Sequence, residues 1–243
     1  MSDEFYIGYE PKMPGALESY IRHVALGIVA LAIVTPALLL YAQDRFAPGV
    51  FEFGRVRTFS GRLIEYPYPA LVAADGSETT AIYWLVGPGK HGAADIVRGR
   101  DGQRVRLSGS LIGREGSAMI EVVPDSLVEV SSTGPVEPMQ SRGVIVAEGE
   151  IVDSKCHLGV MKPGEGPTHR DCAVRCLLGR IPPMFVPRDS PDLGRVSLVS
   201  DAAQPFADPE EFAGRRVAIR GEILQRGTQK FLAVARRDIR VLD

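Results

Sequence analysis

Nineteen consecutive residues without a charged side chain, residues 24–42, constrain the structure of this chain more than any other feature. A helix of that length, rising about 1.5 Å per residue, matches the roughly 30 Å hydrocarbon core of a bilayer. Pro36 lies inside the run and is tolerated in lipid, because Thr35 and small backbone adjustments can satisfy the freed carbonyl. Tyr41 lies near one end, where an aromatic ring favours the membrane interface. The run therefore predicts a transmembrane helix.

The flanking residues favour a retained anchor over a cleaved signal peptide. The N-terminal tail, residues 1–23, is long and mostly acidic, whereas a signal peptide begins with a basic leader, and residues 43–46 form a poor cleavage site. The basic residues near the run lean weakly against an inside N-terminus, but long C-terminal domains translocate largely regardless of flanking charge. We expect a bacterial inner-membrane protein whose C-terminal domains lie in the periplasm.

Composition limits the functions that fit. The formal net charge of −2 argues against nucleic acid as a partner. The sequence contains no Ser-His-Asp order, recognisable catalytic carboxylate pair or nucleotide-binding fingerprint, so it does not predict a conventional hydrolase or transferase. Aromatic residues make up 7% of the chain, too few to indicate the exposed aromatic face of an oligosaccharide- or peptide-binding module.

Beyond the apolar run the chain reads as short β-strands separated by Gly and Pro. Apolar residues alternate in residues 57–64, 81–86, 104–112, 118–123 and 127–130, and again in 143–152, 184–186, 195–199, 216–224, 230–235 and 239–242. Residues 101–130 align without a gap on residues 213–242, and the alternation is kept, so both copies would point the same side chains inward. The pattern indicates a duplication, with residues 131–142 as the linker between the copies.

Each copy carries a G-x-R-V-x-ϕ-x-G motif after a short predicted helix and before two further strands. This arrangement resembles the small five-stranded barrels of the OB type, in which a Gly-rich kink lets a strand bend around the barrel corner. The resemblance implies a mainly β chain, with a transmembrane helix followed by two tandem OB-like barrels in residues 50–130 and 143–243.

All three cysteines and two of the four histidines fall in residues 153–183, an insertion that the first copy lacks. They are Cys156, His157, His169, Cys172 and Cys176. A cysteine that only fills apolar space has no reason to lie near other cysteines. Because function is usually placed on loops of rigid scaffolds, this Cys/His insertion is the candidate site.

The C-terminal half resembles uncharacterised, membrane-anchored bacterial proteins with tandem OB-like domains and a KCxxGVMxPGxGxxHRxCAxxC segment, which begins here at Lys155. The resemblance implies a membrane-anchored bacterial protein and brings no activity with it.

One interpretation of the insertion is a metal site. Cys156, His169, Cys172 and Cys176 form a Cys₃His set, suited to Zn²⁺ or to an Fe–S cluster. Residues 170–178 have a helical composition, so His169, Cys172 and Cys176 would share one helix face.

A second interpretation is a disulfide with one thiol left over. On a helix the Cβ atoms of Cys172 and Cys176 would be roughly 5–6 Å apart, too far for a bond between them, so Cys156 would pair with one of the two. The spare thiol would be buried or reactive, and exposure beside Arg170, Arg175 and His169 would lower its pKa. In a third interpretation the cluster only packs a folded loop.

Three further residues are weaker candidates. His157 can cap or ligate, but we expect it to point to solvent. Lys90 and His91 lie in the Gly-rich residues 87–92, which lack the phosphate-binding motif G-x₄-G-K-[ST], so we expect a turn whose lysine faces solvent. The adjacent Tyr83 and Trp84 are expected in the barrel core and rim.

Together these features predict a non-catalytic accessory or assembly subunit of a membrane redox or electron-transfer complex, acting through contacts with other membrane-complex subunits. The alternative hypothesis is a redox-active or metal-binding protein that uses the cluster for zinc, iron–sulfur or thiol chemistry.

Overall fold

The structure is a computed structural model that describes residues 13–44, 49–73, 81–131 and 136–242. The chain divides into two units, residues 1–47 and residues 48–243. The first unit contains α1 (Gly15–Asp44), with Pro36 inside it. Among the described residues, Gly15–Gln43 is the one helix long and apolar enough to cross a membrane, with a mean hydropathy of 2.4. The predicted run 24–42 forms the C-terminal part of this longer helix.

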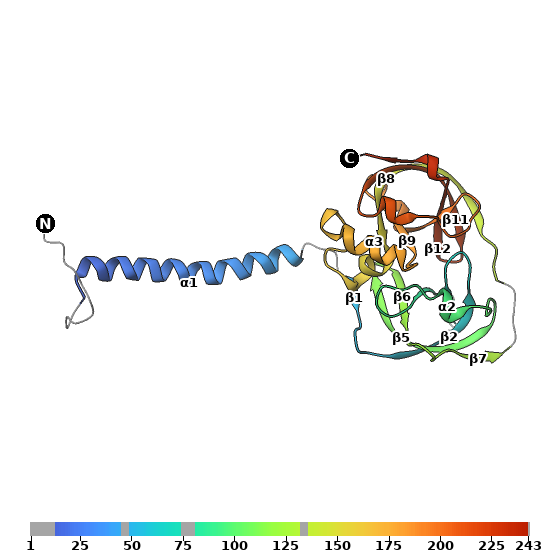
Figure 1. The fold of residues 1–243 in the computed structure, drawn as a ribbon, viewed down its shortest axis with the longest axis horizontal. Coiled ribbons are helices and arrows are strands. Elements are labelled where there is room, and N and C mark those ends of the chain that lie inside the picture. The colour runs from blue at the N-terminus through green and yellow to red at the C-terminus, as the bar shows by residue number, and fades with distance from the viewer. Residues whose placement is uncertain (1–12, 45–48, 74–80, 132–135, 243) are drawn as a thin grey trace. The chain divides into compact units, whose positions relative to one another are not determined.

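The second unit begins with a closed five-stranded barrel, drawn in cyan and green in Figure 1. Its strands are β2 (Arg57–Ile64), β3 (Ala70–Ala73), β4 (Ile82–Val86), β5 (Arg104–Arg114) and β6 (Ser117–Val122). They lie in the order β5-β2-β3-β4-β6, and the pairing of β5 with β6 closes the barrel. Two short strands, β1 (Gly49–Phe51) and β7 (Val128–Ser131), also pair with β5, and α2 (Ala94–Val97) connects β4 to β5.

The second barrel repeats this plan. Its strands are β8 (Gln140–Asp153), β9 (Pro183–Pro187), β10 (Val196–Ser200), β11 (Arg216–Arg226) and β12 (Gln229–Val234), with β13 (Ile239–Val241) paired to β11. They lie in the order β12-β10-β9-β8-β11, and β11 pairs with β12 to close the barrel. Short helices η3 (Pro191–Leu193), η4 (Pro209–Phe212) and η5 (Arg236–Asp238) lie in the connections.

The predicted fold class is confirmed: an apolar N-terminal helix precedes two closed five-stranded barrels of OB type. The pairing registers also correspond. Trp84 lies opposite Met119 where β4 and β6 run parallel, and Ser197 lies opposite Phe231 where β10 and β12 run parallel. Strands β1 and β3 lay outside the predicted set, and β8 begins at Gln140, inside the predicted linker.

The strands facing the other barrel bury both of their sides. Alternate residues fill the barrel interiors, with Leu63, Leu85 and Ile120 in the first and Ile151, Leu198 and Leu232 in the second. The residues between them form a third cluster, the inter-barrel core, to which both barrels contribute. Its largest members are Tyr68, Trp84, Met119, Met184 and Phe231. The rings of Trp84 and Phe231 meet edge to face across the contact, with centroids 5.4 Å apart.

Each barrel also reaches into the other through an arginine at the same position of the duplicated segment. Arg114, at the end of β5, donates to the carbonyl oxygen of His157 at 2.8 Å. Arg226, at the end of β11, donates to the carbonyl oxygen of Tyr66 at 2.8 Å. The contact between the barrels is therefore approximately two-fold symmetric, because equivalent arginines make equivalent contacts with the opposite barrel.

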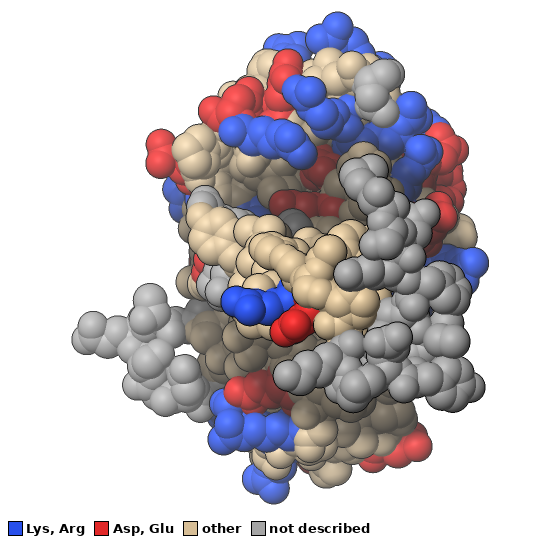
Figure 2. Space-filling model, turned by 90° about the vertical axis from the view of Figure 1, so that its left-hand side faces the viewer, with Lys and Arg blue, Asp and Glu red and all other residues tan. Residues whose placement is uncertain are grey.

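A cleft of about 790 Å³ lies where the first barrel meets the second. The link between β2 and β3 lines it on one side, opposite residues 205–210 and the residues that follow Cys176. In the view of Figure 2, basic and acidic side chains of the described residues are interspersed.

Tyr68 provides a direct test of the contact between the barrels. Its buried hydroxyl donates to the carbonyl oxygen of Leu198 at 2.7 Å and accepts from the Phe206 N–H at 3.0 Å. Tyr68→Phe leaves both groups unpaired, so we expect the free energy of unfolding to fall by about 1–3 kcal/mol in urea titrations of the full chain in detergent. Tyr66→Phe, at a side chain that is 60% exposed, is the matched control; equal losses in both variants would contradict the assignment.

Candidate functional site: three thiols at the junction of the barrels

The Cys/His insertion leaves the end of β8 and returns at β9 through three helical segments. These are η1 (Cys156–Val160), η2 (Pro167–His169) and α3 (Arg170–Leu178). The bounds of α3 coincide with the predicted helix. The chain between η1 and η2 folds back closely, because a Cβ on Gly164 would lie 2.6 Å from the carbonyl oxygen of Cys156. The insertion therefore brings α3 against the residues that begin it.

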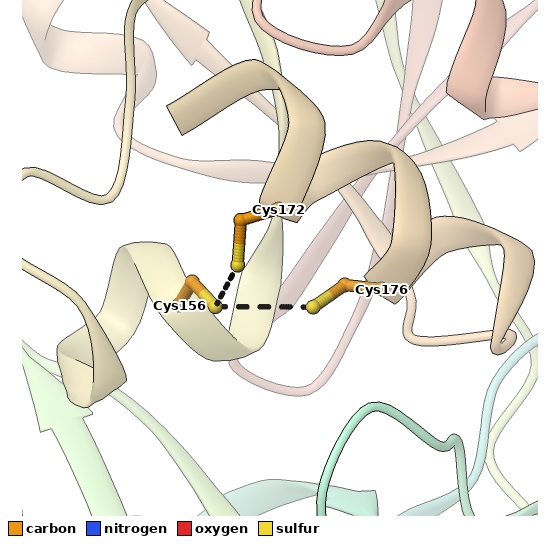
Figure 3. Close-up of side chains that lie close together, drawn as sticks. All are labelled: Cys156, Cys172 and Cys176. Carbon is orange, nitrogen blue, oxygen red and sulfur yellow. Dashed lines mark hydrogen bonds between the residues drawn. The ribbon is translucent and has the colours of Figure 1, made fainter. Parts of the chain in front are cut away.

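The three cysteines converge, as Figure 3 shows, with Cys172 and Cys176 of α3 pointing toward Cys156 of η1. The Sγ atom of Cys156 lies 3.9 Å from the Sγ atoms of both Cys172 and Cys176. All three sulfurs lie within 4.8 Å of one another. Cys156 and Cys176 are buried and Cys172 is half-buried, and all three are free thiols. The predicted bridge from Cys156 stays a prediction, and both partners are equally near.

Lys90 supplies a cation to this three-thiol site from the first barrel. Its Nζ atom donates to the Sγ of Cys172 at 2.8 Å and to the Sγ of Cys176 at 3.5 Å. The hydrogen bond to Cys172 raises the pKa of Lys90 to about 12. The expectation that Lys90 faces solvent is wrong, because the turn that carries it lies against α3.

The thiols also polarise one another. The hydrogen bond with Cys176, and after it burial, raises the pKa of the Cys156 thiol. The same hydrogen bond lowers the pKa of Cys176 to about 7, and the nearby Lys90 acts in the same direction. Of the two, Cys176 is therefore the thiol that ionises more readily.

Close backbone contacts and a buried lysine hold the Lys90 turn in place. The Gly92 N–H donates to the Gly179 carbonyl oxygen at 2.8 Å, and a Cβ on Gly179 would lie 1.7 Å from the Lys90 carbonyl oxygen, so only glycine fits there. Lys155 extends from the second barrel and donates to the carbonyl oxygens of Gly87 and Gly89 at 2.9 and 2.7 Å. Its Nζ atom also pairs with Glu121 of β6. The first barrel is therefore part of the site.

His169 lies beside the thiols but belongs to a second group. Its Nε2 atom lies 2.8 Å from the Oδ2 atom of Asp153, and Asp153 Oδ1 accepts from the Cys156 N–H at 2.8 Å. Potential ligand atoms of Asp153, Cys156 and His169 all lie within 4.8 Å of one another. The predicted Cys₃His set is thus divided into two groups that share Cys156.

His157 is enclosed by arginines, and the expectation that it points to solvent is wrong. Its side chain is 1% exposed, and its Nε2 atom accepts from Arg195 Nε at 2.9 Å. Burial, followed by the charges of Arg114 and Arg195, lowers the pKa of His157 to about 3. The imidazole is therefore neutral at physiological pH, and its Nε2 atom is a hydrogen-bond acceptor for Arg195.

Three other predicted residues are exposed: Arg170, Arg175 and His91. The cation bonded to the thiols is Lys90. Sequence reasoning missed Asp153, Lys155 and Glu121. A signal was available for the first two, because Asp153 directly follows the apolar end of a predicted strand and Lys155 is adjacent to Cys156.

The arrangement is suited to a thiophilic metal ion. An ion centred among three sulfurs spaced as Cys156 is from its two neighbours would lie about 2.3 Å from each, which is the Zn–S bond length in proteins. Thiolate ligands select zinc, copper(I) and iron–sulfur clusters over hard cations. The same arrangement also allows Cys156 to form a disulfide with either partner.

No protein-family model matches the chain, and no match was found among curated proteins or solved structures. The assignment of function therefore depends on the geometry of the site.

Lys155 tests whether the two barrels build the site together. In Lys155→Met, Glu121 and two carbonyl oxygens lose their partner, so we expect a loss of unfolding free energy on the order of 3 kcal/mol. The Lys90 turn should loosen as well, and iodoacetamide should alkylate Cys172 faster than in the wild type. Lys230→Met, at an exposed position of β12, is the control, and equal behaviour of the two variants would contradict the structural role of Lys155.

Burial predicts the order in which the thiols react in the metal-free protein. Cys172 is half-buried, whereas Cys156 and Cys176 are 3% and 1% exposed, so Cys172 should be alkylated first under native conditions. Peptide mass spectrometry after short exposure to iodoacetamide measures the order. In Cys172→Ser the other two thiols should stay unlabelled until urea unfolds the protein, and rapid native labelling of Cys156 would be the opposite result.

Proposed function

We propose that this chain is a membrane-anchored accessory subunit of a membrane redox or electron-transfer complex, and that it holds a thiophilic metal ion between Cys156, Cys172 and Cys176. The observation that carries the proposal is the convergence of three sulfurs within 4.8 Å of one another, from two separate segments of the chain. In this proposal α1 spans a bacterial inner membrane and the barrels lie in the periplasm, in contact with other subunits of the complex.

The surroundings of the sulfurs support a metal site over inert packing. A cysteine that only fills space needs no cation beside it, yet Lys90 extends from the other barrel to two of the three sulfurs. Three thiolates, one divalent ion and one ammonium group sum to zero charge, which favours binding in a site largely shielded from water. The ion would link η1 to α3 and so fix the shape of the insertion that a partner contacts.

Thiol–disulfide exchange is the second candidate, favoured by the pKa of about 7 at Cys176 and the partial exposure of Cys172. Oxidation would join Cys156 to one of its two neighbours with loss of two protons and two electrons to a partner disulfide, which is reduced to two thiols. A sulfur in a disulfide cannot also bind a metal ion as a thiolate. Metal content and thiol count, measured on one preparation, therefore distinguish the two candidate functions.

The test is metal content and free-thiol count of the full chain, purified in detergent without oxygen or chelator. We expect bound zinc, three thiols after metal removal, and an intense sulfur-to-metal charge-transfer band with Co²⁺ as a probe. Loss of an outer partner of a metal ligand already costs about 10–100-fold in affinity, so Cys172→Ser or Cys176→Ser should cost at least that much.

His91→Asn is the matched control, because this exposed imidazole lies next to Lys90 and belongs to neither ligand group. Its Co²⁺ affinity should equal that of the wild type. Absence of metal together with one bridge from Cys156 would replace the metal site by the thiol-exchange account. Absence of metal with three unreactive thiols would leave only packing.

A further inference from the structure

The second ligand group gives the insertion a further potential metal position. Asp153, Cys156 and His169 are all buried, with exposures of 0%, 3% and 3%. Their potential ligand atoms lie within 4.8 Å of one another, and they combine a carboxylate, a thiol and an imidazole. These are the three ligand types that Zn²⁺ accepts in proteins.

The two groups meet at one atom, because Cys156 Sγ belongs to both. A thiolate sulfur has lone pairs enough to bind two metal ions at once. A hydrogen bond from the Cys156 N–H to Oδ1 fixes the Asp153 carboxylate, and the other oxygen, Oδ2, lies beside His169. A second ion would replace the proton that Asp153 and His169 share in their hydrogen bond.

We propose that the insertion binds two metal ions, one held by Cys172 and Cys176 and the other by Asp153 and His169, with the Cys156 thiolate bridging them. This inference rests on the proposed function of the three-thiol site and extends it. Three thiolates, the Asp153 carboxylate and the Lys90 ammonium group sum to −3, so the ligand set carries −1 with one divalent ion and +1 with two. The charge of −1 attracts a second ion, and because the first ion and Lys90 repel it, the second ion binds after the first and more weakly.

A Co²⁺ titration of the full chain in detergent tests the bridge without any substitution. We expect two equivalents to bind in sequence, measured by absorbance and by metal analysis after gel filtration. If Cys156 bridges the ions, the electron paramagnetic resonance signal that grows with the first equivalent should decline with the second, because the two spins couple through sulfur. Two equivalents with additive signals would overturn the bridge.

His169→Asn tests the second position, because the amide retains a hydrogen-bonding group toward Asp153 while removing the imidazole ligand. We expect one equivalent in this variant, with an undiminished charge-transfer band, and two equivalents in the control His91→Asn. A circular dichroism melt verifies folding, and Asp153→Asn serves as the second variant. One equivalent in the wild type, unchanged by His169→Asn, overturns the second ion and leaves the three-thiol site standing. No Co²⁺ binding at all overturns the proposed function itself.

Discussion

The contact between the two barrels brings Lys90 to the three thiols and encloses them. Strands that face the partner barrel are buried on both sides, one side in their own interior and the other in the inter-barrel core. Burial of apolar surface stabilises a fold by roughly 25 cal/mol per Å². Separation of the barrels would expose the inter-barrel core to water and would therefore cost free energy. Cys156 and Cys176 belong to this shared core, so the thiols are fixed by the same packing that joins the barrels.

The polar groups of the site depend on that apolar contact in turn. A buried lysine such as Lys155 is tolerable only where carbonyl oxygens and a carboxylate surround it, and these come from the opposite barrel. The turn that Lys155 holds carries Lys90 to the sulfurs. Hydrophobic packing therefore positions a charge, and that charge helps to lower the pKa of the Cys176 thiol.

Local patterns in the sequence predicted much of the architecture, because they report local physics. Alternating apolar residues predicted most strands, and the composition of residues 170–178 predicted α3 to the residue. Strand β3 was missed because four apolar residues after a Pro-rich link show too little alternation to separate strand from loop.

The failures at the site have one cause. Lys90 and the sulfurs it contacts are more than 80 residues apart in the chain, and only the packing of two barrels brings them together. His157 was expected in solvent because it is adjacent to a candidate ligand, Cys156, whereas its neighbours in space are Arg114 and Arg195. Sequence periodicity carries no information about which loop of one barrel faces which loop of another, so the cysteine cluster was found but its partners were not.

The approximate two-fold relation has a consequence for how such a site can arise. In a dimer of identical barrels, any lengthening of the segment after the first long strand would appear twice, and both junctions would be filled alike. When both copies lie in one chain, one copy can carry a longer segment without the other. Here the insertion carries the thiols, and its last residues line a cleft of about 790 Å³ together with the short link between β2 and β3. The two halves of the contact are thus unlike, although the barrels that build them share one strand order.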